Sequence, residues 1–484
     1  MSKLGTRFKS EFGARIIALA SGTTLVVLLA RMLDPTGYGL LFLAISVAGT
    51  AQLFCKVGIA KSAARHIAQY KETDPGQLKH ILSFSFLLNT IAVLLMSLLF
   101  FYSREHIAVL IGEPSLEPFL LTGVLFIALG TFHFYARVVL QGYEAIAASS
   151  FLKAVNSVAR LAFALGFVLL GYGALGAFFG YVLAFGISSL IGIIYLYDKY
   201  YYNVNYTERE VGIRKKIASY SIPVTVANMG GVLDKRVDTL LVAFFLSPTA
   251  VGYYTISKQI VEHIQTPISA LGFTLAPTFE GLNSSGNRKK AAALYEKALS
   301  QGLLLYIPGS AGLILVAEPM IKLVFGTEYL GAVPVVQSLA IYAIFYSSNK
   351  VTSLALDFLG RAKNRAIAQF LTAVMNVILN IILIPAIGVV GAAHATVITY
   401  SIYSLYNFYI ISSELNVDVV KVAKNIFIIS LITIAMAGTV YLFVDHVTGF
   451  LTLFVTIASG ILIWGILSVL SGILDYEIII EEVL

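Results

Sequence analysis

The sequence predicts an all-α polytopic membrane protein with about fourteen transmembrane helices. Hydrophobic residues make up 58% of the chain and charged residues only 12%, whereas a soluble domain carries about 25% charged residues. Its mean hydropathy is +0.85. The apolar residues form runs of roughly 18 to 30 residues, long enough for a helix to cross the roughly 30 Å hydrocarbon layer.

The predicted spans follow one another along the chain, separated by short polar segments. In the first half they cover residues 12–31, 38–62, 81–103, 118–142, 150–171 and 173–198. In the second half they cover residues 217–246, 249–277, 296–317, 332–358, 364–386, 390–412, 422–444 and 449–472. The first run ends without an A-x-A cleavage site, so we expect a retained helix and not a signal peptide.

The basic residues of the connecting segments predict the orientation. One side of the membrane collects most of them, in the segments that contain Lys3, Arg7, Lys9, Arg15, Lys61, Arg65, Lys71, Lys79, Arg209, Arg214, Lys215, Lys216, Arg288, Lys289, Lys290, Arg361, Lys363 and Arg365. The opposite side has Arg31, Arg104 and Lys322. Because cytoplasmic loops are enriched in Lys and Arg, we expect a multi-pass protein of the cytoplasmic membrane with both termini in the cytoplasm.

Composition and motifs argue against several function classes. Cys55 is the single cysteine, so neither an intrachain disulfide nor a cysteine-based metal site can form. The histidines show no H-E-x-x-H spacing, and there is no nucleophile elbow, Walker loop or dinucleotide fingerprint. The net charge of +7 is explained by topology, since no basic helix or zinc spacing suggests nucleic acid. We expect no enzyme activity, no cofactor, no metal and no nucleic-acid partner.

Two pairs of similar segments, each separated by nearly the same number of residues, predict an internal duplication. The segment Leu33-Asp-Pro-Thr-Gly-Tyr-Gly39 aligns with Leu246-Ser-Pro-Thr-Ala-Val-Gly252 at an offset of 213 residues (246 minus 33). Gly173-Ala-Leu-Gly-Ala177 aligns with Gly388-Val-Val-Gly-Ala392 at an offset of 215. We therefore expect two pseudo-symmetric six-helix lobes, 1–200 and 201–413, followed by a helix pair in 414–484. The simpler interpretation is that the shared pattern L-x-P-T-x-x-G recurs because it forms a favourable turn.

The same segments resemble polysaccharide-biosynthesis flippases. Leu28-Leu-Ala-Arg-Met-Leu-Asp-Pro-Thr-Gly-Tyr-Gly39 is similar to that family's A-R-x-L-G-P-x-x-Y-G segment, and Val139-Leu-Gln-Gly142 is similar to its x-L-Q-G exit from the fourth span. In the second half Arg236 and Asp238 fall on the Arg and Asp of its R-x-D motif. Asp34 and Ser247 depart from the pattern, which usually has Gly at both turns. The resemblance implies export of a lipid-linked oligosaccharide within the multidrug/oligosaccharidyl-lipid/polysaccharide exporter superfamily.

Ionisable and polar residues inside the predicted spans are the candidate site, because such residues are costly in lipid and usually face a cavity or a partner. A cationic set would bind the phosphate of a lipid-linked substrate: Arg160, Lys235, Arg236, Lys258, Lys56, Arg137 and Lys350. An acidic set would carry a coupling H⁺ or Na⁺ or balance the basic charge: Asp234, Asp238 and Glu262. Polar side chains would line the cavity (Asn156, Asn376 and Asn380), and Gly230 and Gly231 would form a hinge.

Structural roles compete with each of these assignments. Lys56, Arg137 and Lys350 lie nearer the cytoplasmic ends and would be able to reach the interface by extending their side chains. Asp234 or Asp238 would instead serve as a structural partner of Arg236 or Lys258 and hold helices together. Asn376 and Asn380 more often form interhelix hydrogen bonds than bind ligands.

The function predicted is a flippase that moves a lipid-linked oligosaccharide by alternating access of two lobes around a cationic cavity. The partners implied are membrane lipids and an isoprenoid-phosphate-linked glycan. One alternative is a cation-coupled multidrug exporter, for which an acidic, aromatic cavity is expected. A second is a flippase for a lipid-linked peptidoglycan precursor. A third is a membrane-embedded glycosyltransferase, against which the short outer loops argue.

Overall fold

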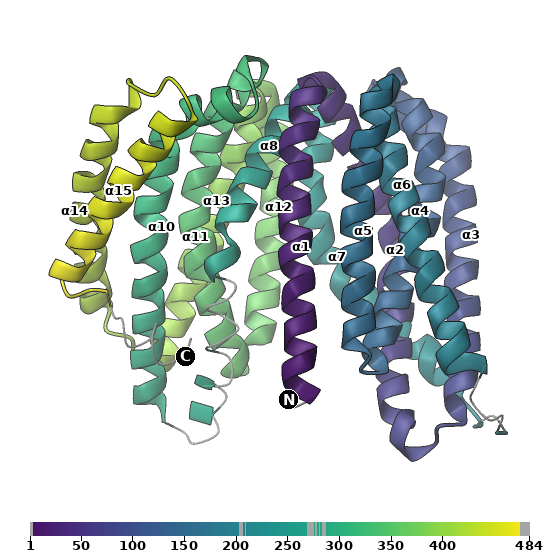
Figure 1. Cartoon of the computed structure of the whole chain (residues 1–484). Coiled ribbons are helices and arrows are strands. Elements are labelled where there is room, and N and C mark those ends of the chain that lie inside the picture. Colours follow the sequence, from purple (N-terminus) through teal and green to yellow (C-terminus); the bar gives the residue numbers. More distant parts are fainter. Residues whose placement is uncertain are drawn as a thin grey trace. The chain divides into compact units, whose positions relative to one another are not determined.

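The computed structural model describes residues 3–202, 207–208, 210–268, 275, 278–279, 281–282 and 287–474, the side chains at 3–9, 57, 222 and 226–235 excepted. Every regular element in this part of the chain is a helix, which confirms the predicted all-α class (Figure 1). The chain divides into two compact units, Met1–Gly252 and Tyr253–Leu484.

Unit 1 contains the first seven long helices. They are α1 (Lys3–Met32), α2 (Pro35–Thr73), α3 (Gln77–Ile111), α4 (Glu117–Gly142), α5 (Ile146–Phe167), α6 (Gly173–Leu196) and α7 (Ile213–Phe245). Short helical turns η1 (Pro114–Leu116), η2 (Val168–Tyr172) and η3 (Tyr197–Tyr202) connect them. Helix α8 (Pro248–Ile264) begins at the end of this unit.

Unit 2 contains the long helices that follow. They are α10 (Arg288–Val324), α11 (Val333–Phe358), α12 (Ala362–Ile387), α13 (Val389–Leu415), α14 (Val419–Val444) and α15 (Phe450–Leu470), with the turn η4 (Thr327–Ala332) before α11. Within the unit α11 packs against α10 and α13, whereas α14 packs against α10 and α15.

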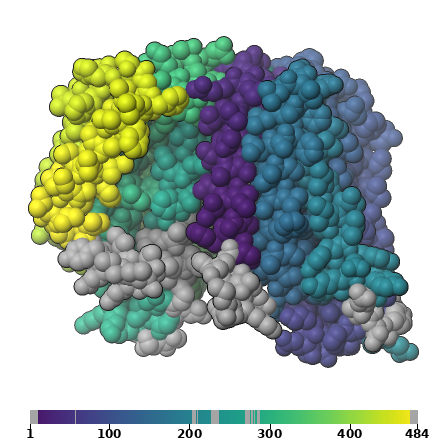
Figure 2. Space-filling view, viewed as in Figure 1, coloured from purple at the N-terminus to yellow at the C-terminus, as the bar shows by residue number. Residues whose placement is uncertain are grey.

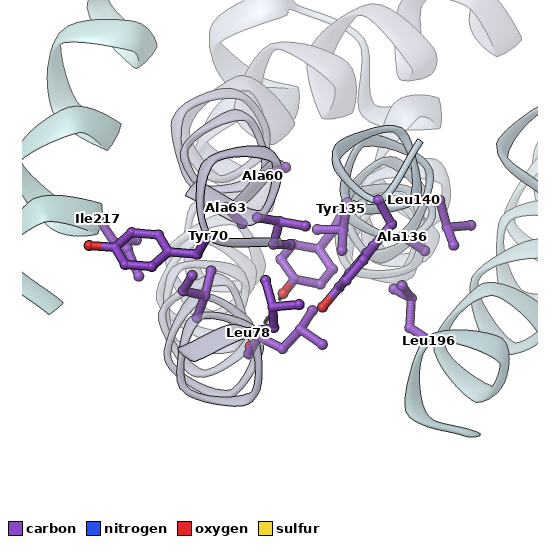
Figure 3. Close-up of a cluster of buried hydrophobic side chains, with 14 of the residues drawn as sticks. Ala60, Ala63, Tyr70, Leu78, Tyr135, Ala136, Leu140, Leu196 and Ile217 are labelled. Carbon is purple, nitrogen blue, oxygen red and sulfur yellow. Dashed lines mark hydrogen bonds between the residues drawn. The ribbon is translucent and has the colours of Figure 1, made fainter. Parts of the chain in front are cut away.

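Helices α2 and α4 lie at the centre of unit 1. Helix α2 packs against α3, α4 and α7, and α4 also packs against α6. Helices α1 and α5 lie side by side and form one face of the unit (Figure 2). Near the end of α2 a buried cluster joins α2, α3, α4 and α7 through residues such as Ile67, Leu78, Tyr135 and Ile217 (Figure 3). This packing fixes the helices that carry the candidate site.

Helices α1 to α8 and α10 to α15 follow the order of the fourteen predicted spans, although α8 covers only the first part of the span 249–277, whose end lies mostly outside the described residues. Among the described residues, ten segments are both long and apolar enough to cross a membrane, and one of them, Ile146–Tyr202, contains both α5 and α6. Helices α7, α8 and α13 are not among these ten, and α8 is 17 residues long. The chain is therefore a multi-pass membrane protein, although ten segments and not fourteen meet the criterion by length and hydropathy alone.

Equivalent positions of the two predicted repeats have the same local structure. Gly173 and Gly388, which begin matching helices, have φ/ψ of 55°/−146° and 68°/−151°, a region that only glycine adopts readily. Asp34 accepts a hydrogen bond from the backbone N of Gly37 at 2.6 Å, and Ser247 accepts one from the backbone N of Ala250 at 3.4 Å. The two departures from the family's Gly are therefore N-caps, each followed by proline at the first helical position.

The two capped turns also meet each other. The hydroxyl oxygens of Thr36 and Thr249, which are separated by the repeat offset of 213 residues, are 2.8 Å apart. A Cβ added to Gly39 would lie 1.7 Å from the carbonyl oxygen of Pro248, and one added to Gly252 would lie 2.2 Å from that of Pro35. Glycine at both positions allows the backbones to approach this closely.

Candidate functional site

Four of the predicted cations come together in unit 1, each from a different helix. They are Lys56 on α2, Arg137 on α4, Arg160 on α5 and Arg236 on α7, and all four are partly buried. Lys56 interacts electrostatically with Arg236 and Arg137, and His133 interacts with Arg137, Lys56 and Arg160. We call these four side chains the cationic cluster.

Arg236 is held against α2 by backbone carbonyls. Its Nη1 donates hydrogen bonds to the carbonyl oxygens of Ile45 at 2.6 Å and Ser46 at 3.3 Å. The guanidinium occupies the space above Gly49, where an added Cβ would lie 1.9 Å from Nη1. Both of these bonds use Nη1, and a guanidinium also carries donors on Nε and Nη2.

Lys56 is positioned by residues of α2 and α4. Its Nζ donates to the side-chain oxygen of Gln52 at 3.3 Å and lies 5.0 Å from the ring centroid of Phe134. Gln52 in turn donates to the carbonyl oxygen of Phe126 at 3.3 Å. Lys56 therefore lies between two helices instead of extending freely toward an interface.

Arg160 and Arg137 each have a buried donor without a partner in the part of the chain that the structure describes. The guanidinium of Arg160 lies 5.2 Å from the ring centroid of Tyr181 on α6. The Nε atoms of Arg137 and Arg160 are both buried, and neither has a hydrogen-bond partner among the described residues. Since a buried unpaired donor is costly, these atoms indicate a place for a water or an anionic ligand.

One carboxylate, Glu11, interacts electrostatically with Arg137 of the cationic cluster. In the part of the chain that the structure describes, no carboxylate forms an ion pair with any of its four side chains. Cations near helix ends behave differently: Lys71 pairs with Glu144 at 2.8 Å, and Arg365 pairs with Asp357 at 2.9 Å. The arrangement is suited to binding an anion with several oxygens, because arginine can donate two hydrogen bonds to such an anion at once.

Asn156 belongs to a polar seam beside the cluster. Its Nδ2 donates to Ser188 Oγ on α6 at 3.4 Å, and the same Oγ lies 2.7 Å from Nδ1 of His133 on α4. In unit 2 the Nδ2 atom of Asn376 donates to Thr399 Oγ1 at 3.4 Å, which joins α12 to α13. Asn380 donates to the side-chain oxygen of Asn376 at 2.9 Å. Asn156 and Asn376 therefore link helices, whereas the hydrogen bonds that Asn380 donates to Asn376 stay within α12.

The remaining described candidates lie outside the cationic cluster. In unit 2 the Nζ of Lys258 lies 5.7 Å from the ring centroid of Tyr254, and the side chains of Glu262 and Lys350 are exposed. In unit 1 Asp238 is buried and takes part in at least one polar or electrostatic interaction.

Four predicted residues, Asp234, Lys235, Gly230 and Gly231, lie outside the residues whose side chains the structure describes. Their predicted roles in binding, coupling and hinge motion stay predictions. Among the described residues, no group of three or more His, Cys, Asp or Glu side chains is placed to hold a metal ion.

Sequence reasoning missed the residues that position the cluster. Gln52 precedes Lys56 by four residues, a spacing that places both on one face of a helix and was available as a signal. Gly49 and Tyr181 had no such signal, because their roles depend on side chains from other helices.

The sequence comparisons identify the family. A profile of the polysaccharide biosynthesis protein family matches residues 14–282. The probable flippase AglR of Haloferax volcanii is 24% identical over 402 residues, which is 81% of this chain and 79% of that protein. The probable low-salt glycan biosynthesis flippase Agl15 of the same organism is 25% identical over 176 residues, 36% of this chain and only 37% of that protein's length.

The solved structures agree on the fold. The lipid II flippase MurJ in an inward closed conformation aligns with a TM-score of 0.77 at 19% identity, covering 98% of this chain and 99% of that one. An inward-facing multidrug resistance MATE family transporter aligns with a TM-score of 0.71 at 15% identity, covering 83% and 98%. The chain thus has the same all-helical fold as these two transporters. By its match to the family profile, it belongs to the polysaccharide biosynthesis protein family.

Proposed function

We propose that this protein moves a lipid-linked oligosaccharide from the cytoplasmic to the outer leaflet of the cell membrane, without covalent chemistry. The observation that carries the proposal is the cationic cluster, four basic side chains from four helices without a described ion-pair partner. The family and the flippase names of the relatives point to the same class of substrate.

The cluster would recognise the part that all such substrates share. A lipid-linked glycan carries a phosphate or diphosphate between its sugar and its isoprenoid chain. Because this group is charged, it loses the most hydration free energy when it leaves water. Arg160 and Arg137 offer buried Nε donors without a partner among the described residues, Arg236 offers a guanidinium anchored through Nη1, and Lys56 adds a point charge. Partly buried charges attract more strongly than exposed ones, since less water screens them.

The transport cycle we propose is a rocking of lobe 1–200 against lobe 201–413, with 414–484 as an accessory helix pair. The glycan would cross in the cavity while the isoprenoid chain stays in lipid. Lys235, Lys258 and Lys350 would extend the cationic path, and Asn156, Asn376 and Asn380 would line it. Asp234, Asp238 and Glu262 would carry H⁺ or Na⁺ or balance charge, and Gly230 and Gly231 would act as a hinge.

Two other functions have support from the fold. The likeness to a MATE transporter favours a cation-coupled multidrug exporter, and the likeness to MurJ favours export of a peptidoglycan precursor. A cationic cluster repels the cationic drugs that such exporters often carry, so the multidrug alternative fits the charges less well. The peptidoglycan alternative has the same substrate chemistry, an anionic isoprenoid lipid.

Deletion of the gene in its host tests the proposal. We expect lipid-linked glycan to accumulate on the cytoplasmic leaflet, with loss of the glycan from the cell surface. Re-expression of the wild-type protein should restore the surface glycan, and Arg236→Gln should restore much less. A deletion strain with normal surface glycan and altered sensitivity to drugs would favour the multidrug alternative instead.

A further inference from the structure

A groove of about 700 Å³ lies between α2, α3 and α7 of unit 1. Its walls are almost wholly apolar and include Ala51, Phe54 and Leu99. The two polar residues among its lining are Thr50 and Ser103, and the hydroxyl of Thr50 already donates to the carbonyl oxygen of Ser46 at 2.7 Å. An apolar space of this kind holds hydrocarbon and not ordered water.

The groove lies next to the cationic cluster. Leu240, which lines the groove, follows Arg236 by four residues, so the two side chains share a face of α7 one turn apart. On α2 the carbonyl oxygen of Ser46 accepts from Arg236 and also from Thr50, which lines the groove. The guanidinium therefore lies within about one helical turn of the groove wall.

The depth of Arg236 in the membrane determines which kind of lipid can contact both the groove and the cationic cluster. Arg236 lies nine residues before the end of α7 at Phe245, or about 13 Å along the helix at 1.5 Å per residue. An ordinary phospholipid keeps its phosphate at the membrane surface, because moving it to this depth costs its hydration. A lipid whose headgroup is being carried across presents its phosphate at that depth and its chain beside it.

We propose that the groove between α2, α3 and α7 holds the isoprenoid chain of the transported lipid while its phosphate contacts Arg236. This inference rests on the proposed function and adds a place for the lipid chain. With both termini in the cytoplasm, the groove lies in the outer half of the membrane, since it runs from Arg236 toward the end of α7. It would then receive the chain late in the transfer.

Varying the length of the isoprenoid chain, with the phosphate unchanged, tests the groove separately from the phosphate site. Dissociation constants are measured for undecaprenyl phosphate and farnesyl phosphate, with the full-length protein in one detergent. The wild type should prefer the longer chain about fivefold, because only this chain fills the groove and gains its packing contacts. Leu99→Trp and Ala51→Phe, which fill the groove, should remove the preference.

The matched control is Leu98→Trp. Leu98 neighbours Leu99 on α3 and has similar exposure, 54% against 60%, but does not line the groove. It should keep the wild-type preference, and equal melting temperatures would show that all variants fold. Groove-filling variants that keep the preference, or a wild type without one, would overturn the inference. So would equally effective competition by dioleoyl phosphatidylglycerol, since the groove would then hold bulk lipid.

Arg236→Gln separates the two proposals. It should weaken binding of both phosphates by the same factor and leave the preference for the longer chain intact. Unchanged affinity for both ligands would mean that the phosphate does not lie at Arg236, which overturns the proposed site and this placement with it. If Arg236→Gln weakened binding but the wild type showed no preference for the longer chain, only the placement of the isoprenoid chain in the groove would be overturned.

Discussion

At the residue scale, the site depends on the space that Gly49 leaves for Arg236. The guanidinium lies where a Cβ on residue 49 would be, and two carbonyl oxygens of α2 hold it there. A side chain as small as alanine at this position would displace it. The position of the charge is therefore set by a residue that carries no charge.

The first prediction follows from this contact. Gly49→Ala should weaken binding of undecaprenyl phosphate roughly tenfold or more, because hydrogen bonds to charged groups contribute about 1.5–3 kcal/mol each. Titration of the purified protein with that lipid measures the effect. Gly166→Ala on α5, where an added Cβ meets nothing within 4 Å, is the control and should bind normally. Wild-type affinity in Gly49→Ala would contradict the assigned position of Arg236.

Sequence reasoning found the charges of the site but not their supports. A buried charge stands out in an apolar run, so Lys56, Arg137, Arg160 and Arg236 were all identified as candidates. Their grouping depends on how α2, α4, α5 and α7 pack, which a single sequence does not encode locally. The support of Lys56 by Gln52 is different, because the two residues are four apart on one helix and their spacing is visible in the sequence.

At the element scale, the capped turns that begin α2 and α8 contact each other through Thr36 and Thr249. Thr36 and Thr249 hold equivalent positions in the two predicted repeats, at an offset of 213 residues. Because alternating access requires one end of the cavity to open, the lobes we propose would have to part here.

A pair of cysteines tests that expectation. In a Cys55→Ser background, Thr36→Cys with Thr249→Cys should form a disulfide under mild oxidation, since the two hydroxyl oxygens are 2.8 Å apart. The cross-link should stop glycolipid transport until a reductant is added, and each single cysteine variant should transport normally. Full transport by the cross-linked protein would show that these turns stay together throughout the cycle.

A second contact fixes the segment before α7 to α2. Glu210 accepts hydrogen bonds from Lys216 at 2.7 Å and from the hydroxyl of Tyr70. These bonds hold the pKa of the Glu210 carboxyl below its usual value of 4.5. A lowered folded-state pKa contributes stability above the unfolded value, and this is lost as the pH falls through the folded one.

Glu210→Gln should therefore lower the melting temperature at pH 7 but not at acidic pH. The curves of the variant and the wild type should converge as the pH falls below about 4.5, where the wild-type carboxyl takes up a proton. Melting temperature measured from pH 3 to pH 8 is the readout. A difference that does not change with pH would show that the carboxylate charge is not the cause.

The helices themselves were the most predictable part of the chain. The described helices follow the predicted apolar runs in order, because the length of a span is set by the membrane and is visible in the sequence. The run 249–277 is the exception, since α8 covers its first part and most of its end lies outside the described residues. Asp34 and Ser247 were treated only as turn residues, whereas both cap the helices that follow. Their capping role depends on hydrogen bonds to backbone N–H groups, which only the structure reveals.

At the scale of the whole molecule, the basic loops predict an orientation with both termini in the cytoplasm. In a Cys55→Ser background, a membrane-impermeant maleimide should label Ser115→Cys on intact cells and Lys289→Cys only after permeabilisation. Both positions are exposed in the structure, so access to the label depends on the side of the membrane. The opposite labelling pattern would invert the proposed topology and the direction of transport.

The central claim is that the cationic cluster binds the anionic headgroup of a lipid-linked glycan during transfer. The most direct test is translocation of a fluorescent undecaprenyl-diphosphate-linked disaccharide by purified protein in vesicles. Wild type should move it, and the triple variant Lys56→Gln/Arg160→Gln/Arg236→Gln should move it at least about tenfold more slowly, since three charged contacts are lost. Arg104→Gln, which removes a charge at the end of α3, should not slow it. Translocation by the triple variant at the wild-type rate would contradict the account.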